Sequence, residues 1–236
     1  MAKLLVLSLA ETTRQVNGYA VIARNIENQD SGWVIIPSLP EQQLNIDGKN
    51  QWDIFAVTEA DLEIDYSANR NEVYNVKTIS YLPSMIKKSI TDNVNRNKLL
   101  EYLSCDTIPE LSGHWVGILK DCIIDDIIFR KKSHENNLDP RQTFYWECRI
   151  VFSDSVGNRW QYNIAPGVAC KDMRFKAYWK DLFLTNRDAF EEKKEKWINY
   201  MRKNHSYLLI EFIPNDFYGT IAMVSGVFCI KNEEEK

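Results

Sequence analysis

The sequence has no apolar run long enough to cross a lipid bilayer. Its longest continuous apolar stretches are short, as in residues 4–7 and 34–37, whereas a membrane-spanning helix needs roughly 20 such residues. Near the N-terminus, Lys3 is followed by a brief apolar stretch that Ser8 and Glu11 interrupt, which is too short for the core of a secretory signal. We therefore expect a soluble, cytoplasmic protein that does not associate with membranes.

The spacing of cysteine and histidine predicts no metal site. The five cysteines are odd in number, widely spread and never arranged as C-x-x-C: Cys105, Cys122, Cys148, Cys170 and Cys229. The three histidines are equally isolated: His114, His134 and His205. Several of the cysteines lie in apolar, strand-like segments, where a thiol packs as a small hydrophobic group. We expect reduced thiols, as in the cytoplasm, and neither a bound metal nor a cofactor.

Catalytic motifs are missing as well. There is no G-x-S-x-G and no glycine-rich loop that would hold phosphates. Asp139, Glu147 and Arg149 resemble an Asp…Glu-x-Lys metal-dependent nuclease motif, in which carboxylates hold Mg²⁺. However, Arg149 replaces the lysine, and a guanidinium cannot release a proton to act as a base. The sequence neither supports nor excludes an enzyme, and we expect no Mg²⁺-dependent nuclease activity.

Adjacent acids at Asp125 and Asp126 are a second candidate for binding a cation. Neighbouring residues of a regular strand point to opposite faces, so the two carboxylates cannot converge unless the backbone bulges. We therefore expect a turn or a bulge at this position rather than a metal site.

The net charge of −4 argues against a protein that coats nucleic acid through bulk electrostatics. The charge is unevenly distributed, however. Residues 171–204 contain ten Lys and Arg against six Asp and Glu, a net charge of +4, so the rest of the chain carries −8. Such a balance leaves room for one local basic site.

The composition and the hydrophobic pattern predict a mainly β fold with minor α content. Aromatic residues make up 12% of the chain and only nine residues are glycine, which suits half-buried sheets. In residues 144–152 apolar and polar residues alternate with a period of two, a turn follows at 153–158, and the alternation resumes at 160–164. This pattern predicts a hairpin whose inward side chains are buried together: Phe144, Trp146, Ile150, Phe152, Trp160 and Tyr162.

Further elements complete the prediction for the second half. We expect a strand at 114–129, a loop at 131–143, one long helix at 186–203 and strands at 206–212 and 220–230. The first half contains five strand candidates and a helix: residues 3–8, 18–24, 33–37, 53–58, 72–81 and 84–103. A boundary near 105–112 divides the chain into an N-terminal domain, 1–108, and a C-terminal domain, 109–236.

Five strands with a helix between the third and the fourth is the order of the five-stranded barrel that binds oligonucleotides and oligosaccharides, the OB fold. The chain resembles the prokaryotic dual-OB-domain proteins in four segments: an opening apolar strand at 3–8, Gly18-Tyr19-Ala20-Val21-Ile22-Ala23, Gly32-Trp33-Val34-Ile35-Ile36-Pro37 and Val224-Ser225-Gly226-Val227-Phe228. It departs from that family after Trp33, where an arginine is expected and Val34-Ile35-Ile36 is found.

The resemblance implies two OB-like five-stranded barrels packed together, each with an accompanying helix. It also implies a non-catalytic binding role, in a larger prokaryotic assembly such as a defence system. The function expected is therefore a nucleic-acid-binding module for single-stranded or structured nucleic acid. The alternative is an adaptor that binds a partner protein.

Residues 171–180 interleave cations with aromatic side chains, as single-strand binders do. Arg174, Lys176 and Lys180 would contact phosphates, and Tyr178 or Trp179 would stack on a base. The alternative is a helical turn in which Phe175 and Trp179, four residues apart, pack on the barrel while the lysines are solvated.

The outward face of the predicted hairpin provides a second candidate surface, because strands two and three carry the ligand in OB folds. Its members are Tyr145, Arg149, Arg159 and Gln161. The alternative is that they are ordinary exposed strand residues, with Arg149 opposite an acid such as Glu147 or Asp154.

Overall fold

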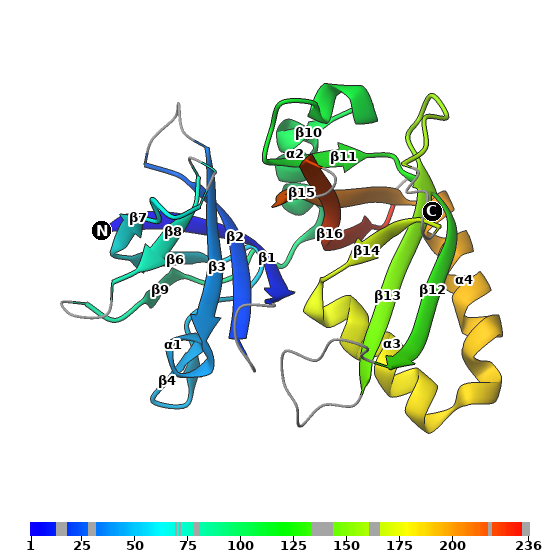
Figure 1. The fold of residues 1–236 in the computed structure, drawn as a ribbon, viewed down its shortest axis with the longest axis horizontal. Helices are drawn as coiled ribbons and strands as arrows, with labels where there is room; N and C mark the ends of the chain where they lie inside the picture. The colour runs from blue at the N-terminus through cyan, green and yellow to red at the C-terminus, as the bar shows by residue number, and fades with distance from the viewer. Residues whose placement is uncertain are drawn as a thin grey trace. The chain divides into compact units, whose positions relative to one another are not determined.

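The computed structural model describes residues 1–12, 18–27, 32–68, 70, 72–77, 81–133, 144–160, 166–216 and 219–232. It divides into two compact units, Met1–Arg96 and Asn97–Lys236. Both are built mainly of strands (Figure 1), so the predicted mainly β class is confirmed. Within the described residues, no helix is both long enough and apolar enough to span a membrane.

The first unit contains a five-stranded antiparallel sheet in the order β3-β2-β1-β6-β9. Its strands are β1 (Ala2–Glu11), β2 (Gly18–Asn25), β3 (Trp33–Pro40), β6 (Val57–Ala60) and β9 (Ser84–Lys87). Short elements lie between them: α1 (Glu41–Leu44), β4 (Asn45–Ile46), β5 (Lys49–Asn50), β7 (Leu62–Ile64) and β8 (Tyr74–Val76). One face of the sheet forms a core with Leu4, Val6, Val21, Ile36 and Trp52.

The second unit contains a seven-stranded sheet in the order β10-β11-β15-β16-β14-β13-β12. Its strands are β10 (Ser104–Cys105), β11 (Val116–Lys120), β12 (Ile123–Ser133), β13 (Phe144–Ser153), β14 (Val168–Cys170), β15 (His205–Asn215) and β16 (Gly219–Ile230). Two helices, α3 (Met173–Thr185) and α4 (Phe190–Lys203), follow β14. The core collects apolar side chains of β12, β13, β15 and β16 with those of α3 and α4.

The ladders among the described residues leave both sheets open, with two edge strands each. In the second unit, Asp121 and Cys122 separate β11 from β12, and Asp121 adopts a left-handed backbone conformation with φ of 49°. The strand predicted at 114–129 is therefore two strands, which pair with β15 and β13 respectively. Closed five-stranded barrels are not established by these ladders.

The predicted hairpin is partly observed. Cys148, Ile150 and Phe152 of β13 are buried, and Trp146 and Trp160 pack partly buried against the same core, so the expected period of two is confirmed. Residues 161–165 and the side chain of Phe144 lie outside the described residues. The described partners of β13 are β12 and β14.

Two helix predictions need correction. The helix predicted at 84–103 is α2 (Asn93–Leu103), because residues 84–87 pair with β6 as β9. Asp92 accepts hydrogen bonds from the backbone and side-chain nitrogens of Asn95, which fixes the start of α2. The helix predicted at 186–203 is α4, preceded by a 3₁₀ turn at Arg187–Ala189, and residues 173–185 form a second long helix.

Candidate nucleic-acid interface

The outward face of β12 and β13 carries a group of cations around one carboxylate. Ile127 and Phe129 point into the core, so the alternate residues Arg130 and Lys132 point outward. On β13, Glu147 lies opposite Arg130 and Tyr145 lies opposite Lys132. Because the register places these side chains on one face, we call Arg130, Lys132, Tyr145, Glu147 and Arg149 the basic face.

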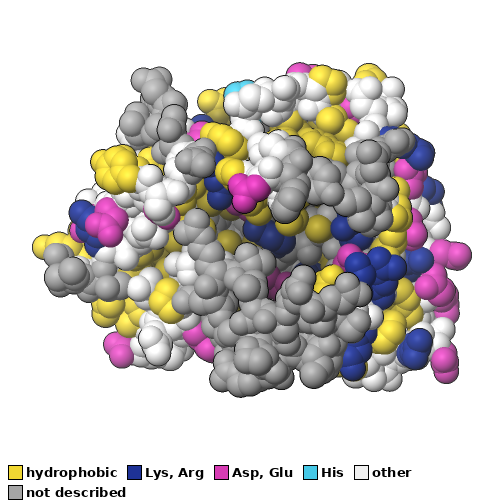
Figure 2. Space-filling view, viewed as in Figure 1, with side chains coloured by type: hydrophobic (Ala, Val, Ile, Leu, Met, Phe, Trp, Pro, Cys, Tyr) yellow, Lys and Arg dark blue, Asp and Glu magenta, His cyan; other side chains and the backbone are white. Residues whose placement is uncertain are grey.

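Glu147 is the centre of the basic face. Its Oε2 is 2.5 Å from Nε of Arg130, and its Oε1 is 3.4 Å from Nζ of Lys132 and 3.9 Å from a terminal nitrogen of Arg149. The Glu147 side chain is only 10% exposed, whereas those of Arg130 and Lys132 are 50% and 45% exposed. Lys and Arg side chains gather in Figure 2 where Figure 1 places β12 and β13. Three cations and one carboxylate leave this face net positive.

The surroundings of Glu147 keep it ionised. Its partial burial favours the neutral acid and raises the pKa, but the hydrogen bond from Arg130 and the charges of Arg130 and Lys132 outweigh that effect. The pKa of Glu147 is therefore lowered from its usual value. At neutral pH the carboxylate is an anion fixed among cations.

Arg149 is engaged by the protein itself. Its Nε donates to the carbonyl of Pro166 at 2.8 Å and a terminal nitrogen donates to the carbonyl of Gly167 at 2.6 Å. Only 12% of its side chain is exposed. Arg149 is not the exposed residue opposite an acid that the alternative expected, because it lies opposite Ile128 and is 3.9 Å from Glu147 of its own strand. Its hydrogen bonds hold the segment before β14.

The other two residues expected on this hairpin contribute less. Arg159 forms an ion pair with Asp125 at 3.1 Å, and half of its side chain remains exposed. Gln161 lies outside the described residues. The structure therefore places Tyr145 and Arg149 on one face and Arg159 beside the bulge of β12.

Arg130 and Lys132 were missed because the strand was predicted to end at Phe129 and residues 131–143 were predicted to form a loop. The structure continues β12 to Ser133, paired with β13 throughout. The sequence carries no alternation that marks this continuation, because three apolar residues, 127–129, are followed directly by three basic ones, 130–132. Only the pairing with β13 shows that Arg130 and Lys132 share one outward face.

The other candidate surface, residues 171–180, belongs mostly to the amphipathic helix α3, which begins at Met173. Asp172 caps α3 by accepting hydrogen bonds from the backbone nitrogens of Arg174 and Phe175. Phe175 and Trp179 are buried and pack edge-on against Trp197 of α4. The packed-helix alternative is thus confirmed for these two aromatics. The stacking role considered for Trp179 is wrong, because its side chain has no exposed surface.

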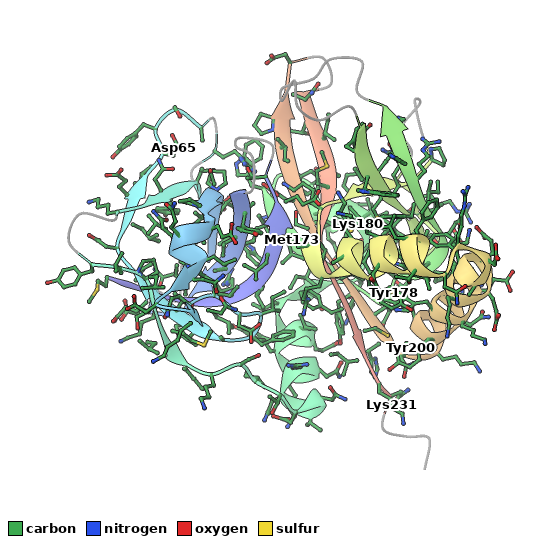
Figure 3. All side chains as sticks on the ribbon, turned by 90° about the horizontal axis from the view of Figure 1, so that it is seen from below. Asp65, Met173, Tyr178, Lys180, Tyr200 and Lys231 are labelled. Carbon is green, nitrogen blue, oxygen red and sulfur yellow. The ribbon has the colours of Figure 1, made fainter. Side chains whose placement is uncertain are left out.

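The exposed residues of α3 do not share a single face. Positions four apart lie together on a helix, so Lys176 and Lys180 lie on one flank of α3, and Arg174 and Tyr178 on the other. Figure 3 shows Lys180 and Tyr178 on opposite sides of the helix. Phe175 and Trp179 lie between the two flanks and are buried in the core. The helix therefore separates Arg174 and Tyr178 from Lys176 and Lys180.

A metal centre is not supported among the described residues. No group of three or more His, Cys, Asp or Glu could hold an ion there. The expected bulge is present, since the register of β12 shifts between Ile124 and Asp126. Asp125 contacts Arg159 and Arg202, and Asp126 contacts Lys194, so both acids face cations. Asp139, the first residue of the nuclease-like motif, lies outside the described residues.

In a comparison with known proteins, no family model and no curated protein matches this chain.

Proposed function

We propose that this chain is a non-catalytic nucleic-acid-binding module that binds single strands on the outward face of β12 and β13. The observation that carries the proposal is the basic face, where exposed Arg130 and Lys132 lie beside Tyr145. Single-strand binders combine cations for phosphates with aromatic rings for bases, and this face supplies both. The negative net charge of the whole chain favours a local site over general coating.

The arrangement of the second unit supports an OB-type barrel as part of this proposal. The strand order β12-β13-β14-β16-β15, with β14 and β16 parallel and the helices between β14 and β15, is that of an OB fold. The ring would be completed by β11 and β12, two consecutive stretches that pair with β15 and β13. In that fold β13 is the second strand, and strands two and three carry the ligand, so the β13 part of the basic face lies on the ligand face.

Similar features support an OB-type barrel in the first unit. β1, β2 and β3 form an antiparallel meander, and β6 pairs with β1. β7 follows β6 after Asp61 and pairs with β8, while Ile35 of β3 forms a parallel bridge with Val73 next to β8. The two units together are the main support for the resemblance to dual-OB-domain proteins, and for a place in a larger prokaryotic assembly.

The proposal is tested by titrating the protein with a labelled single strand of about 16 nucleotides, the upper end of the range that one OB fold covers. We expect association whose logarithm falls steeply with the logarithm of salt concentration. Lys132→Ala should weaken binding and flatten this slope by about 0.7 for each lost phosphate contact. Tyr145→Ala should weaken binding, by about 1–3 kcal/mol for a stacked base, without changing the slope.

Two further variants locate the site. Lys196→Ala removes the same charge from α4, where Lys196 pairs with Glu192 on an exposed surface, and should bind as the wild type does. Lys180→Ala removes a charge from α3, so its loss of affinity can be compared with that of Lys132→Ala on the basic face. If the folded wild type does not associate even at low salt, the proposal fails and the adaptor becomes the better interpretation. Equal effects of Lys196→Ala and Lys132→Ala would exclude the basic face as the site.

A further inference from the structure

The basic face already contains an anion in the place where a ligand phosphate would be expected. Cations from two strands converge on the Glu147 carboxylate: Arg130 and Lys132 from β12, and Arg149 from its own strand. Cations grouped around one small anion are the arrangement that binds a phosphate group. Here the protein supplies the anion itself.

The Glu147 carboxylate is placed to compete with a ligand phosphate and not to be displaced by it. Because only 10% of its side chain is exposed, water and salt screen its charge poorly. Arg149 is bonded to the carbonyls of Pro166 and Gly167, so one of the cations around Glu147 cannot move toward solvent. A ligand phosphate would approach Arg130 and Lys132 from outside while Glu147 continues to attract both from within.

The contact between Glu147 and Arg130 leaves part of the Arg130 guanidinium available to a ligand phosphate. Glu147 engages Nε of Arg130, and among the described residues no acceptor is bonded to its two terminal nitrogens. A guanidinium held in this way can still present both terminal nitrogens to a phosphate, although its charge is partly neutralised.

We infer that Glu147 is a built-in competitor that weakens the binding of nucleic-acid phosphates to Arg130 and Lys132 and so sets the affinity of the basic face. This inference rests on the proposed function. Its consequence is an affinity lower than the number of cations suggests, with rapid release of the strand. A module that exchanges ligands within a larger assembly would need this property.

The decisive variant is Glu147→Gln, which keeps nearly the same shape and an oxygen that can accept from Arg130 but removes the charge. Binding of the labelled single strand at low salt should tighten on the order of tenfold, as expected when a unit charge is removed within several ångströms of a phosphate near a protein surface. The salt dependence should steepen by up to about 0.7, because one more cation becomes available to the strand.

The matched control is Glu192→Gln, which makes the same change of net charge at the exposed Glu192–Lys196 pair of α4. A second test is the double variant Arg130→Ala with Glu147→Gln. If Arg130 is the cation that Glu147 restrains, most of the gain should disappear in the double variant. If Glu147→Gln does not fold, Glu147→Thr removes the same charge with a residue that favours strands.

The outcomes separate this inference from the proposed function. Tighter, more salt-sensitive binding by Glu147→Gln with no change in Glu192→Gln supports the inference, even if the wild type binds too weakly to detect. A wild type that binds through Lys132, together with a Glu147→Gln variant that binds equally or less well, overturns the inference and leaves the function standing. If Glu192→Gln binds more tightly by the same factor, the gain in affinity is a bulk charge effect and the inference is overturned. If neither the wild type nor Glu147→Gln binds, both fail.

Discussion

Asp172 accepts a hydrogen bond from the backbone nitrogen of Val227, 55 residues further along the chain, at 2.9 Å. Its other carboxylate oxygen caps α3 through the nitrogens of Arg174 and Phe175. One buried side chain therefore holds the start of the helix against β16. Figure 3 shows Met173, the first residue of α3, at the end of the helix nearest that strand.

Replacing Asp172 by alanine should destabilise the fold strongly. The helix cap alone contributes about 0.5–2 kcal/mol. An unsatisfied, partly buried N–H at Val227 adds up to about 1–3 kcal/mol. We expect a loss of about 2–4 kcal/mol in the free energy of unfolding, measured in urea. Asp181→Ala, an exposed acid in the same helix, should change that free energy by less than about 0.5 kcal/mol.

Trp179→Ala should lower stability by about 3–5 kcal/mol, because its buried ring packs against Phe190 and Trp197. Tyr178→Ala, next to it on an exposed flank, should cost far less. Thermal or urea unfolding of the two variants makes the comparison. A Trp179→Ala protein as stable as the wild type would contradict the observed packing.

Asp154 should make the fold sensitive to acid. It accepts hydrogen bonds from the backbone nitrogens of Ile108, Val156 and Asn158. Although burial opposes ionisation, these bonds lower the pKa of Asp154. With the folded pKa below the unfolded value, its contribution is complete above the unfolded pKa, near 3.9, and is lost as pH falls through the folded pKa.

The test compares the wild type with Asp154→Asn in urea between pH 7 and pH 3. The variant should be less stable at pH 7, and the difference should narrow as the pH falls below about 4. A difference that stays constant over this range would show that ionisation of Asp154 does not contribute.

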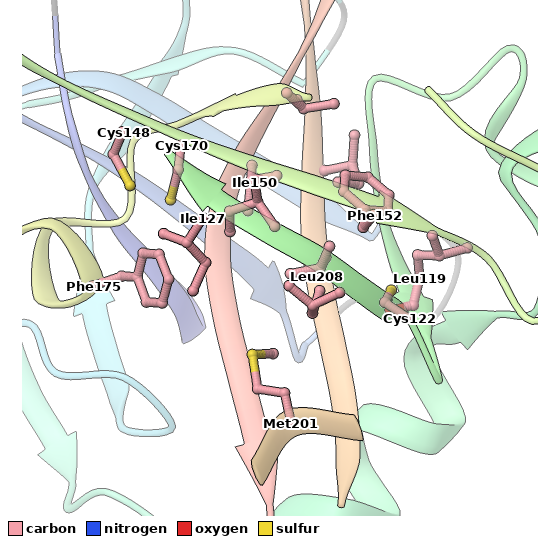
Figure 4. Close-up of a cluster of buried hydrophobic side chains, with 14 of the residues drawn as sticks. Leu119, Cys122, Ile127, Cys148, Ile150, Phe152, Cys170, Phe175, Met201 and Leu208 are labelled. Carbon is pink, nitrogen blue, oxygen red and sulfur yellow. The ribbon is translucent and has the colours of Figure 1, made fainter. Parts of the chain in front are cut away.

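The cysteines should be unreactive in the folded protein. Burial raises the pKa of Cys105 and of Cys229 to about 11, so roughly a thousandth of each is thiolate at pH 8. Cys148 and Cys170 lie side by side in the core (Figure 4), on adjacent strands, and burial also raises the pKa of Cys170 well above its usual value. A disulfide reagent should modify all five thiols quickly only in denaturant. A rapid reaction of the folded protein would contradict this burial.

β2, β3, β13, β15 and β16 all lie close to their predicted positions. β13 could be predicted because it buries one face, which imposes a period of two, whereas β2, β3 and β15 could be predicted as short apolar runs and are buried on both faces. α3 was not recognised as a long helix because its lysines and aromatics also fit a ligand site, and only packing against Phe190 and Trp197 decides between them. The register that joins Arg130 to Glu147 depends on pairing between distant segments and is invisible to local patterns.

The bulge in β12 also sets the phase of that strand. Before it Ile124 is buried, and after it Ile127 and Phe129 are, so the inward positions change from even to odd numbers. Deleting one residue between Ile124 and Ile127 would remove the bulge and leave Ile127 and Phe129 facing the core, with Arg130 and Lys132 still facing outward. Deleting one residue after the bulge, such as Ile128, would instead exchange the two faces and turn Arg130 and Lys132 toward the core. The basic face therefore tolerates the loss of one residue at the bulge but not the loss of one residue a few positions further along the same strand.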